Sequence, residues 1–279
     1  NDPSVLTYKG FHDLSAFWAR HVRGDTLVLV LTCANTTIDE STARFVIDEY
    51  SSGFQNKISS EGDDARRRRA SVCRGDDRRN AICYQHSHPT EYVRSFAVAR
   101  LFIYGAYACT GWLVSRSPSL LLTNEHCLMK DRDVENTDFE FMGEEPSCGA
   151  TSGNCMVCDR GVIYDGRKLL KVSYDKDYAL VELEGDPAGR FGTLHFDPRP
   201  STVLQNIPIY IPQHPGGRAK ELAIQDTFHH LNKCRIKGLQ ASCKRSTYQS
   251  DLAYSCDTEG GSSGSPVIAR DSHKVVALH

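Results

Sequence analysis

The sequence predicts a mainly β protein in which a strand-rich region follows a small N-terminal unit. Three observations lead to this fold class. From residue 93 onward, apolar runs of strand length are separated by turn residues. A polar stretch at residues 52–69 ends in four consecutive arginines and has the composition of a solvated linker. Eleven cysteines are spread along the chain, a pattern typical of disulfide-bonded proteins from an oxidising compartment.

The apolar runs fall into two groups. The first group, which we expect to close a barrel, lies at residues 96–103, 109–115, 119–123, 162–164, 169–174 and 179–184. Residues 192–206 carry turn signals around Pro198 and Pro200 and predict a crossing to a second barrel. Its strands are expected at residues 207–211, 222–226, 234–236 and 252–256. Because the chain stops at residues 275–279 in the middle of an apolar run, we expect this second barrel to be incomplete, with its C-terminal end truncated.

Composition narrows the class of protein. A chain of 279 residues with 40% hydrophobic residues has room for one large domain or two to three small ones. The formal net charge of −2 argues against a nucleic acid or a membrane surface as partner, since such binding needs a basic face. The longest apolar run, residues 27–31, is far shorter than the roughly 18 to 20 residues of a membrane helix.

Residues 1–69 are interpreted as a propeptide or accessory unit, with a strand at 26–32 and a helix at 41–49. Cleavage after Arg69, at the end of the run that begins at Arg66, would start a mature chain at Ala70, and a solvated basic loop is the open alternative. Asn35 begins a glycosylation sequon, which agrees with secretion. No leader peptide is visible at Asn1, so we expect the start to be trimmed.

Candidate chemistry centres on residues 260–267 (GGSSGSPV), a run of small residues in front of an apolar strand. A serine on a glycine turn exposes its hydroxyl, and the N–H groups of Gly261 and Ser263 would point at the same spot as an oxyanion hole. A serine nucleophile needs a histidine to take its proton and a carboxylate to orient that histidine. His126 follows one apolar strand and Asp177 precedes another. The chain order is therefore His, Asp, Ser.

Four segments carry a family resemblance: residues 108–114 (ACTGWLV), 122–127 (LTNEHC), 177–183 (DYALVEL) and 261–266 (GSSGSP). In this order they resemble the trypsin-like serine endopeptidases of the chymotrypsin fold, closest in wording to the bacterial lysyl and glutamyl endopeptidases, from Cys73 onward. The resemblance implies two antiparallel β-barrels, at 70–192 and 193–279, with the site between them. It makes His126 the general base, Asp177 its orienting carboxylate and Ser263 the nucleophile.

The same resemblance implies a secreted serine endopeptidase that forms an acyl-enzyme and is made as a zymogen. It implies no metal and no organic cofactor, and its partners would be protein or peptide substrates and protease inhibitors. The competing hypothesis is a catalytically silent protease homologue acting as a binding or inhibitor-decoy module, which the expected truncation favours and the intact triad disfavours.

Two details near the base need their own interpretation. Asn124 and Glu125 stand where the family usually carries two small residues. Glu125 could raise the pKa of His126 or face solvent, and we favour solvent because charged side chains are rarely buried unpaired. Asp175 competes with Asp177, and the spacing to the apolar run that follows selects Asp177.

Cysteine pairing is predicted mainly by the resemblance. It joins Cys109 to Cys127, a bridge that would brace the loop of the base, and Cys83 to Cys148. It also pairs Cys73 with a cysteine beyond residue 279, which would explain the odd count. Zinc ligation by the run of cysteines at 148, 155 and 158 is the disfavoured alternative, and the sequence does not decide how the cysteines at 234, 243 and 256 pair.

The residue that fixes substrate choice is left between two alternatives. Asp257 lies six residues before Ser263, where trypsin-like enzymes hold the carboxylate that binds a lysine or arginine side chain. Thr258 and His279 lie where glutamyl endopeptidases hold a hydroxyl and an imidazole for a glutamate side chain. A basic substrate follows if Asp257 points into the pocket, and an acidic one follows if Asp257 turns away to backbone N–H groups. We slightly favour the basic substrate, because a carboxylate at that position has the simpler direct role.

Overall fold

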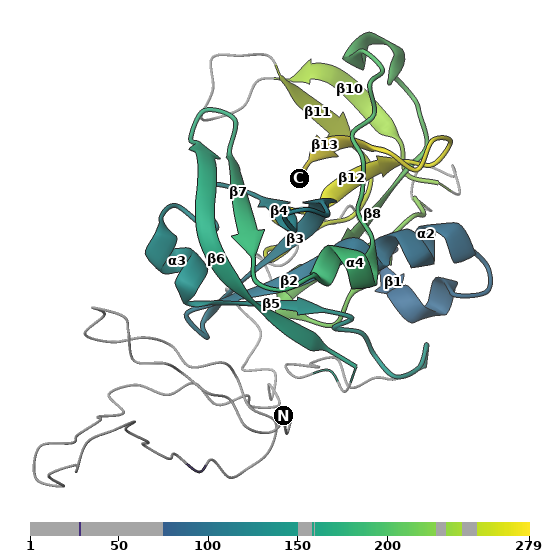
Figure 1. The fold of residues 1–279 in the computed structure, drawn as a ribbon. Coiled ribbons are helices and arrows are strands. Elements are labelled where there is room, and N and C mark those ends of the chain that lie inside the picture. The colour runs from purple at the N-terminus through teal and green to yellow at the C-terminus, as the bar shows by residue number, and fades with distance from the viewer. Residues whose placement is uncertain (1–27, 29–74, 150–157, 159, 227–232, 242–249) are drawn as a thin grey trace, which may run out of the picture.

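The computed structural model describes residue 28 and residues 75–149, 158, 160–226, 233–241 and 250–279 (Figure 1). The predicted N-terminal strand and helix, the arginine run, Cys73, Cys155 and Cys243 lie outside the described residues. Within the described part, the molecule is mainly β and contains a closed barrel and further sheets, which confirms the predicted fold class. No helix of this part is long and apolar enough to cross a membrane.

Six antiparallel strands close the first barrel in the order β2-β3-β4-β7-β6-β5. Their bounds are β2 Val98–Ile103, β3 Tyr107–Ser115, β4 Leu120–Thr123, β5 Thr137–Phe141, β6 Val162–Ser173 and β7 Tyr178–Leu183. Apolar side chains of these strands fill the barrel, since Leu101, Trp112, Leu121, Phe139 and Val181 are all fully buried.

The long strand β6 corrects the sequence prediction of two separate strands with a turn between them. Gly166 reads as a turn signal, but it lies within β6, where the register shifts between Gly166 and Lys168 indicate a bulge. A Cβ atom on Gly166 would come within 2.3 Å of the Val134 side chain, so the glycine is needed for packing and does not end the strand. Strand β5 was not predicted, although its alternate residues are buried in the core.

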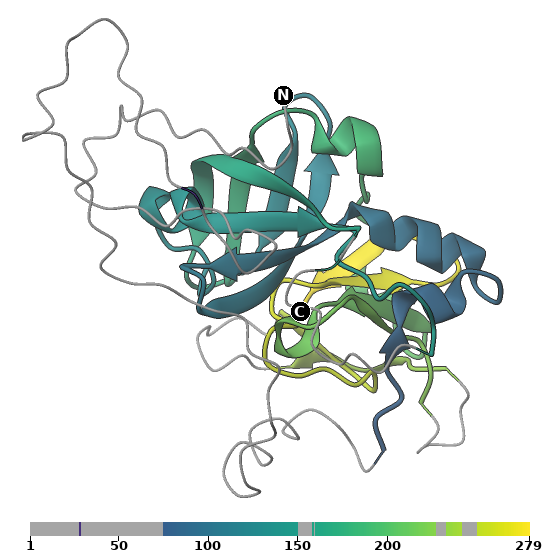
Figure 2. The ribbon, with the colours of Figure 1, turned by 90° about the horizontal axis from the view of Figure 1, so that it is seen from below.

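The second group of strands forms a five-stranded sheet in the order β1-β9-β8-β12-β13 and a two-stranded ribbon, β10-β11. The bounds are β1 Arg79–Asn80, β8 Ile209–Gln213, β9 Glu221–Ala223, β10 Ile236–Ala241, β11 Asp251–Tyr254, β12 Pro266–Ala269 and β13 Val275–Leu278. The two groups lie against each other, and the C-terminal end lies where they meet (Figures 1 and 2). Their boundary near residue 192 stays a prediction.

Strand β1 connects distant parts of the chain. Arg79 and Asn80 precede the first barrel in sequence, yet they pair with Leu222 and Glu221 of β9 in the second sheet. Residues just after the predicted processing site therefore lie along the second group of strands.

Helices are short and occupy the connections. They are α2 Pro89–Arg94, α3 Asp131–Glu135 and α4 Pro187–Phe191, with 3-10 turns η1 Ala81–Tyr84, η2 Ser95–Ala97, η3 Ser201–Val203 and η4 Pro215–Gly217. None of the described helices carries a candidate catalytic residue. The site therefore depends on strand ends and turns.

Candidate active site

His126 and Asp177 are brought together by the pairing of β4 with β7. Thr123 at the end of β4 lies opposite Ala179 near the start of β7, so the turn after β4 lies beside the residue before β7. The Asp177 carboxylate accepts two hydrogen bonds from His126: Oδ2 lies 2.8 Å from Nδ1 and Oδ1 lies 3.1 Å from the backbone N. This two-point contact fixes both the position and the orientation of the imidazole. The imidazole remains 36% exposed.

Asn124, noted in the sequence only as a departure from the family pattern, supports this pair. Its Nδ2 donates a 2.8 Å hydrogen bond to the backbone carbonyl of Asp177. Asp177 has a φ of +47°, a left-handed conformation that is costly for a residue other than glycine, and the bond from buried Asn124 holds it there. The adjacent Glu125 is half-buried, and its influence on His126 stays a prediction.

The glycine turn around Ser263 has the conformation that the small residues predicted. Gly261 has a φ of +94°, and a Cβ atom there would lie 2.7 Å from the backbone oxygen of His214. Gly264 has a φ of +88°, and its Cβ atom would lie 2.0 Å from the carbonyl oxygen of Thr110. Within the described residues, the N–H groups of Gly261 and Ser263 have no protein acceptor. Their role as the oxyanion hole stays a prediction.

Thr110 joins the two halves of the site. Its N–H donates to the carbonyl of Ser263 at 2.8 Å, and its hydroxyl donates to the carbonyl of Gly261 at 2.9 Å. The neighbouring Cys109 forms a disulfide with Cys127, the residue after His126. Two hydrogen bonds and one disulfide therefore connect the serine turn to the histidine turn.

Every cysteine of the first half that the structure describes is engaged in a disulfide. Cys83 is bonded to Cys148, and Cys158 is also disulfide-bonded. A group of possible metal donors at Cys109, His126 and Cys127 has all its atoms within 4.8 Å, but the two sulfurs are bonded to each other. Since zinc needs free thiolates, the disulfides of Cys148 and Cys158 count against the zinc alternative, whose third cysteine, Cys155, lies outside the described residues. In the second half, Cys234 pairs with Cys256, which the sequence did not decide.

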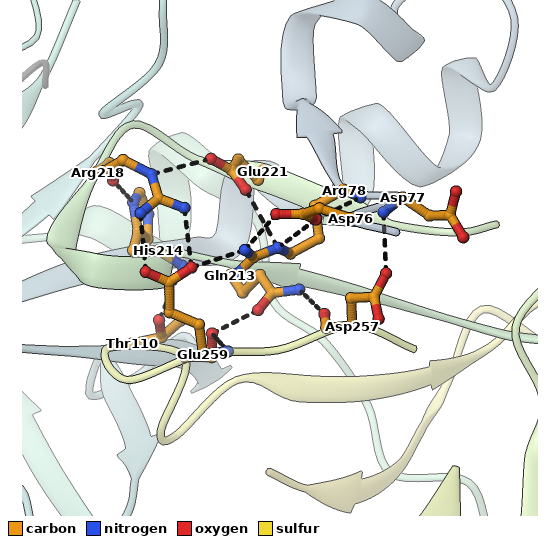
Figure 3. A network of polar contacts seen from close by, with 11 residues as sticks. Asp76, Asp77, Arg78, Thr110, Gln213, His214, Arg218, Glu221, Asp257 and Glu259 are labelled. Atoms are coloured by element: carbon orange, nitrogen blue, oxygen red, sulfur yellow. Dashed lines mark hydrogen bonds and ion pairs between the residues drawn. The ribbon is translucent and has the colours of Figure 1, made fainter. Parts of the chain in front are cut away.

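Asp257 is buried and turned toward a backbone N–H group. Its Oδ2 accepts a 2.9 Å hydrogen bond from the N–H of Asp77, a residue 180 positions earlier in the chain (Figure 3). Thr258, which follows it, is also buried, with 3% of its surface exposed. Of the two orientations left open for Asp257 by the sequence, this contact corresponds to the one turned away to the backbone.

His279 lies beside the serine turn. Its N–H donates to the carbonyl of Ser265 at 2.9 Å, and its own carbonyl accepts from the N–H of Gly264 at 2.9 Å. Burial lowers the pKa of His279 to about 4, and the charge of His126 acts in the same direction. Its Nδ1 contacts the hydroxyl of Tyr254, a residue that sequence reasoning did not single out. Because burial raises the pKa of Tyr254, this hydroxyl stays protonated and can donate to the imidazole.

Gln213 is a further residue that the sequence did not indicate. Its side chain lies between the Ser262 hydroxyl, 2.5 Å from Oε1, and the backbone carbonyl of Asp257, 2.9 Å from Nε2. All of these groups are buried. No motif marks Gln213, because its role depends on two residues about 44 and 49 positions later.

Comparison with known proteins decides the family. The model of the trypsin-like peptidase domain matches residues 109–278, more than half of the chain. This chain belongs to that family. A relative named secreted RxLR effector protein 73, from Plasmopara viticola, is 31% identical over 288 residues that include 100% of this chain and 67% of the relative.

This trypsin-like peptidase chain also resembles two solved protease structures. A structure of a Glu endopeptidase is 17% identical, with 75% of this chain and 86% of that chain covered and a TM-score of 0.49. The active form of the Rv3671c protease from M. tuberculosis is 13% identical, with coverage of 70% and 74% and a TM-score of 0.45.

Proposed function

We propose that this trypsin-like peptidase chain is an active serine endopeptidase. Ser263 Oγ attacks the carbonyl carbon of the scissile bond while His126 takes its proton, and Asp177 holds the imidazole. The N–H groups of Gly261 and Ser263 stabilise the oxyanion. When the C–N bond breaks, His126 returns the proton to the leaving amine. A water molecule, activated by His126 in turn, releases the acyl group as a carboxylic acid.

One observation carries this proposal: the Asp177 carboxylate accepts hydrogen bonds from both Nδ1 and the backbone N of His126, at 2.8 and 3.1 Å. A solvated turn aspartate would have no reason to take both donors from one histidine. With Nδ1–H donating to the carboxylate, Nε2 is left as the acceptor, which is the tautomer that a general base requires.

A fluorophosphonate probe tests the nucleophile. The full-length protein, after processing, should be labelled covalently, and mass spectrometry of the labelled peptide should place the adduct on Ser263. The neighbouring Ser262 is a matched internal control, because its hydroxyl is fully buried and engaged with Gln213. Loss of labelling in Ser263→Ala supports the proposal. An unlabelled wild-type protein, or an adduct that persists in Ser263→Ala, contradicts it.

We further propose that the pocket takes an acidic side chain, with His279 and Thr258 as its recognition groups. The hydrogen bond from Asp77 to Asp257 supports this, because it directs the Asp257 carboxylate to the backbone. With Tyr254 donating to Nδ1, His279 carries its ring hydrogen on Nε2 and can donate it to a carboxylate. This favours the alternative to which the sequence gave the lesser weight.

Peptide-library profiling tests the pocket. Cleavage after glutamate should fall roughly 10- to 100-fold in His279→Ala, the loss expected for one hydrogen bond to a charged group. Asp257→Asn is the matched control, because its amide oxygen still accepts from the Asp77 N–H while the charge is lost. Cleavage after lysine or arginine that Asp257→Asn abolishes would overturn the acidic assignment.

A catalytically silent homologue that binds protease inhibitors is the second candidate function. The observation that favours it is the relative named as an effector, which aligns with the whole of this chain. In that case wild-type protein stays unlabelled by the probe, and wild-type and Ser263→Ala proteins bind a proteinaceous inhibitor equally well.

Secretion and processing complete the proposal. The disulfides and the relative named as secreted support an extracellular protein. We propose that the N-terminal unit is removed after Arg69, so that secreted material begins at Ala70. N-terminal sequencing of an active preparation checks this, and intact chain alone in such a preparation would contradict it. Glycosylation at Asn35 should then be confined to the removed unit.

A further inference from the structure

We propose that Arg78 is a positioning residue for the oxyanion loop, which we define as residues 257–263. The inference rests on the proposed function, since it concerns the same site. Arg78 does not reach the reacting atoms. It acts through Glu259, whose backbone is bonded to the serine turn, and so couples the segment just before the first barrel to the geometry of the nucleophile (Figure 3).

The segment around Arg78 holds the start of the oxyanion loop at two points. Arg78 Nη2 lies 2.6 Å from Glu259 Oε2, and the N–H of Asp77 donates to Asp257 at 2.9 Å. The Arg78 side chain is 3% exposed and that of Glu259 is 7% exposed. This ion pair is therefore shielded from water. A shielded charge pair has much more influence than a pair on the surface.

Glu259 transmits its position to the serine turn through its backbone. Its carbonyl accepts from the N–H of Ser262 at 3.0 Å, and its own N–H donates to the Ser262 hydroxyl at 3.2 Å. Gly261 and Ser263, which carry the donors of the oxyanion hole, are the two neighbours of Ser262. A displacement of Glu259 would move both donors.

The negative charges around Glu259 explain why Arg78 is needed to keep the Glu259 side chain in place. Three carboxylates, those of Asp76, Glu221 and Glu259, share the guanidinium groups of Arg78 and Arg218 (Figure 3). Without Arg78, Arg218 alone would face all three acidic residues. The Glu259 side chain should then move outward to water, because solvation relieves its repulsion with the nearby carboxylate of Glu221, which is also largely shielded from water.

Arg78 also lies on the C-terminal side of the predicted cut after Arg69. Removal of the N-terminal unit would leave Arg78 attached to the catalytic part, and β1 pairing with β9 keeps the segment in place. The anchor is thus part of the peptidase itself and independent of the removed unit.

The test compares Arg78→Met with Arg79→Met in the full chain. Arg79 is the adjacent residue in β1 and is exposed, so it controls for the loss of a positive charge. Hydrogen–deuterium exchange of the peptide covering residues 257–266 should become at least about tenfold faster in Arg78→Met and stay unchanged in Arg79→Met, because local opening is set by local contacts. This readout needs no activity.

Catalysis gives the second readout. In Arg78→Met, kcat should fall roughly 10- to 100-fold, the cost expected when reacting groups are displaced by about 1 Å, while KM changes by less than about threefold. Arg78→Lys should recover part of kcat, since it keeps the charge but not the fork of the guanidinium. Glu259→Gln, which removes the charge at the other end of the pair, is the substitute if Arg78→Met does not fold.

The outcomes separate the two proposals. Equal exchange of residues 257–266 in Arg78→Met, Glu259→Gln and Arg79→Met overturns the role of Arg78, whatever the activity. A KM increase with unchanged kcat also overturns it. An inactive wild-type protein refutes the proposed function, and the exchange experiment still shows whether Arg78 holds the loop.

Discussion

Replacing Asp177 by asparagine tests the proposed mechanism most directly. Its carboxylate accepts from two donors on His126, Nδ1 and the backbone N, at 2.8 and 3.1 Å. An asparagine side chain offers one acceptor and one donor. If the amide oxygen faces the backbone N–H, the NH₂ group faces Nδ1, which must then accept. The ring hydrogen moves to Nε2, and His126 can no longer take a proton from Ser263. If the amide flips, its NH₂ group opposes the backbone N–H.

The magnitude follows from this conflict. Presenting the wrong tautomer at this position of a serine triad costs about 10⁴-fold in kcat, or about 5 kcal/mol of transition-state stabilisation. Stability should change little, because the two side chains are 36% and 26% exposed and ion pairs of that exposure contribute less than about 1 kcal/mol. The variant should therefore unfold near the wild-type temperature while losing nearly all turnover.

Steady-state hydrolysis of an ester or peptide substrate, with circular dichroism melting in parallel, makes the measurement. Asp175→Asn is the matched control, since Asp175 lies in the same turn and was the competing candidate in the sequence. It should retain wild-type turnover. If Asp175→Asn loses activity and Asp177→Asn stays within tenfold of wild type, the assignment of the orienting carboxylate is refuted.

Three further predictions concern the turn, the disulfide and pH. Gly261→Ala should lower kcat roughly 10²- to 10³-fold, as for the loss of an oxyanion donor. The reason is that the new Cβ atom would lie 2.7 Å from the carbonyl oxygen of His214 and displace the turn. Steady-state kinetics measure this effect, and a wild-type kcat would contradict the prediction. Replacing both Cys109 and Cys127 by alanine should cost about 3 kcal/mol and lower Tm by roughly 6–12 °C in a melting experiment, and an unchanged Tm would be inconsistent with a stabilising bridge. Burial lowers the pKa of His279 to about 4 in the folded protein, below its value of about 6.5 in the unfolded chain. As pH falls, the unfolded state therefore binds the proton first. The free energy of unfolding should then decrease as pH drops from about 6.5 towards 4. Urea unfolding of wild type and His279→Gln between these pH values checks the sign, and a drop of equal size in both proteins would exclude His279 as a source.

The pairing of His126 with Asp177 was predicted through the resemblance to the trypsin-like endopeptidases, because no local rule connects two residues 51 positions apart. Each residue adjoins an apolar run of strand length, and ends of adjacent antiparallel strands lie side by side. The sharp turn at Gly261 could also be predicted, since its positive φ is a property that glycine supplies by itself. The bulge at Gly166 was not predicted, because glycine occurs both where a strand ends and where a strand bends, and the sequence does not distinguish the two.

What the sequence could not provide depends on contacts between distant segments. The side-chain amide of Asn124 bonds a backbone carbonyl 53 positions away, and no spacing rule connects the two residues. Cys234 and Cys256 pair because strands β10 and β11 run antiparallel near them, whereas their sequence allowed three pairings of the cysteines at 234, 243 and 256.

Substrate choice is the clearest case in which a contact between distant segments decides what the local sequence leaves open. The same contact region links the specificity proposal to the role of Arg78. The sequence left the direction of the Asp257 carboxylate open between two alternatives, and in the structure this carboxylate accepts a hydrogen bond from the N–H of Asp77, which precedes the whole first barrel. The adjacent residue, Arg78, binds Glu259 two positions after Asp257. The same short segment therefore contacts both Asp257, which bears on the proposed specificity, and Glu259, which bears on the proposed role of Arg78. Since both effects depend on one docked strand, a variant that releases this segment should alter specificity and turnover together, whereas a change confined to His279 should alter specificity alone.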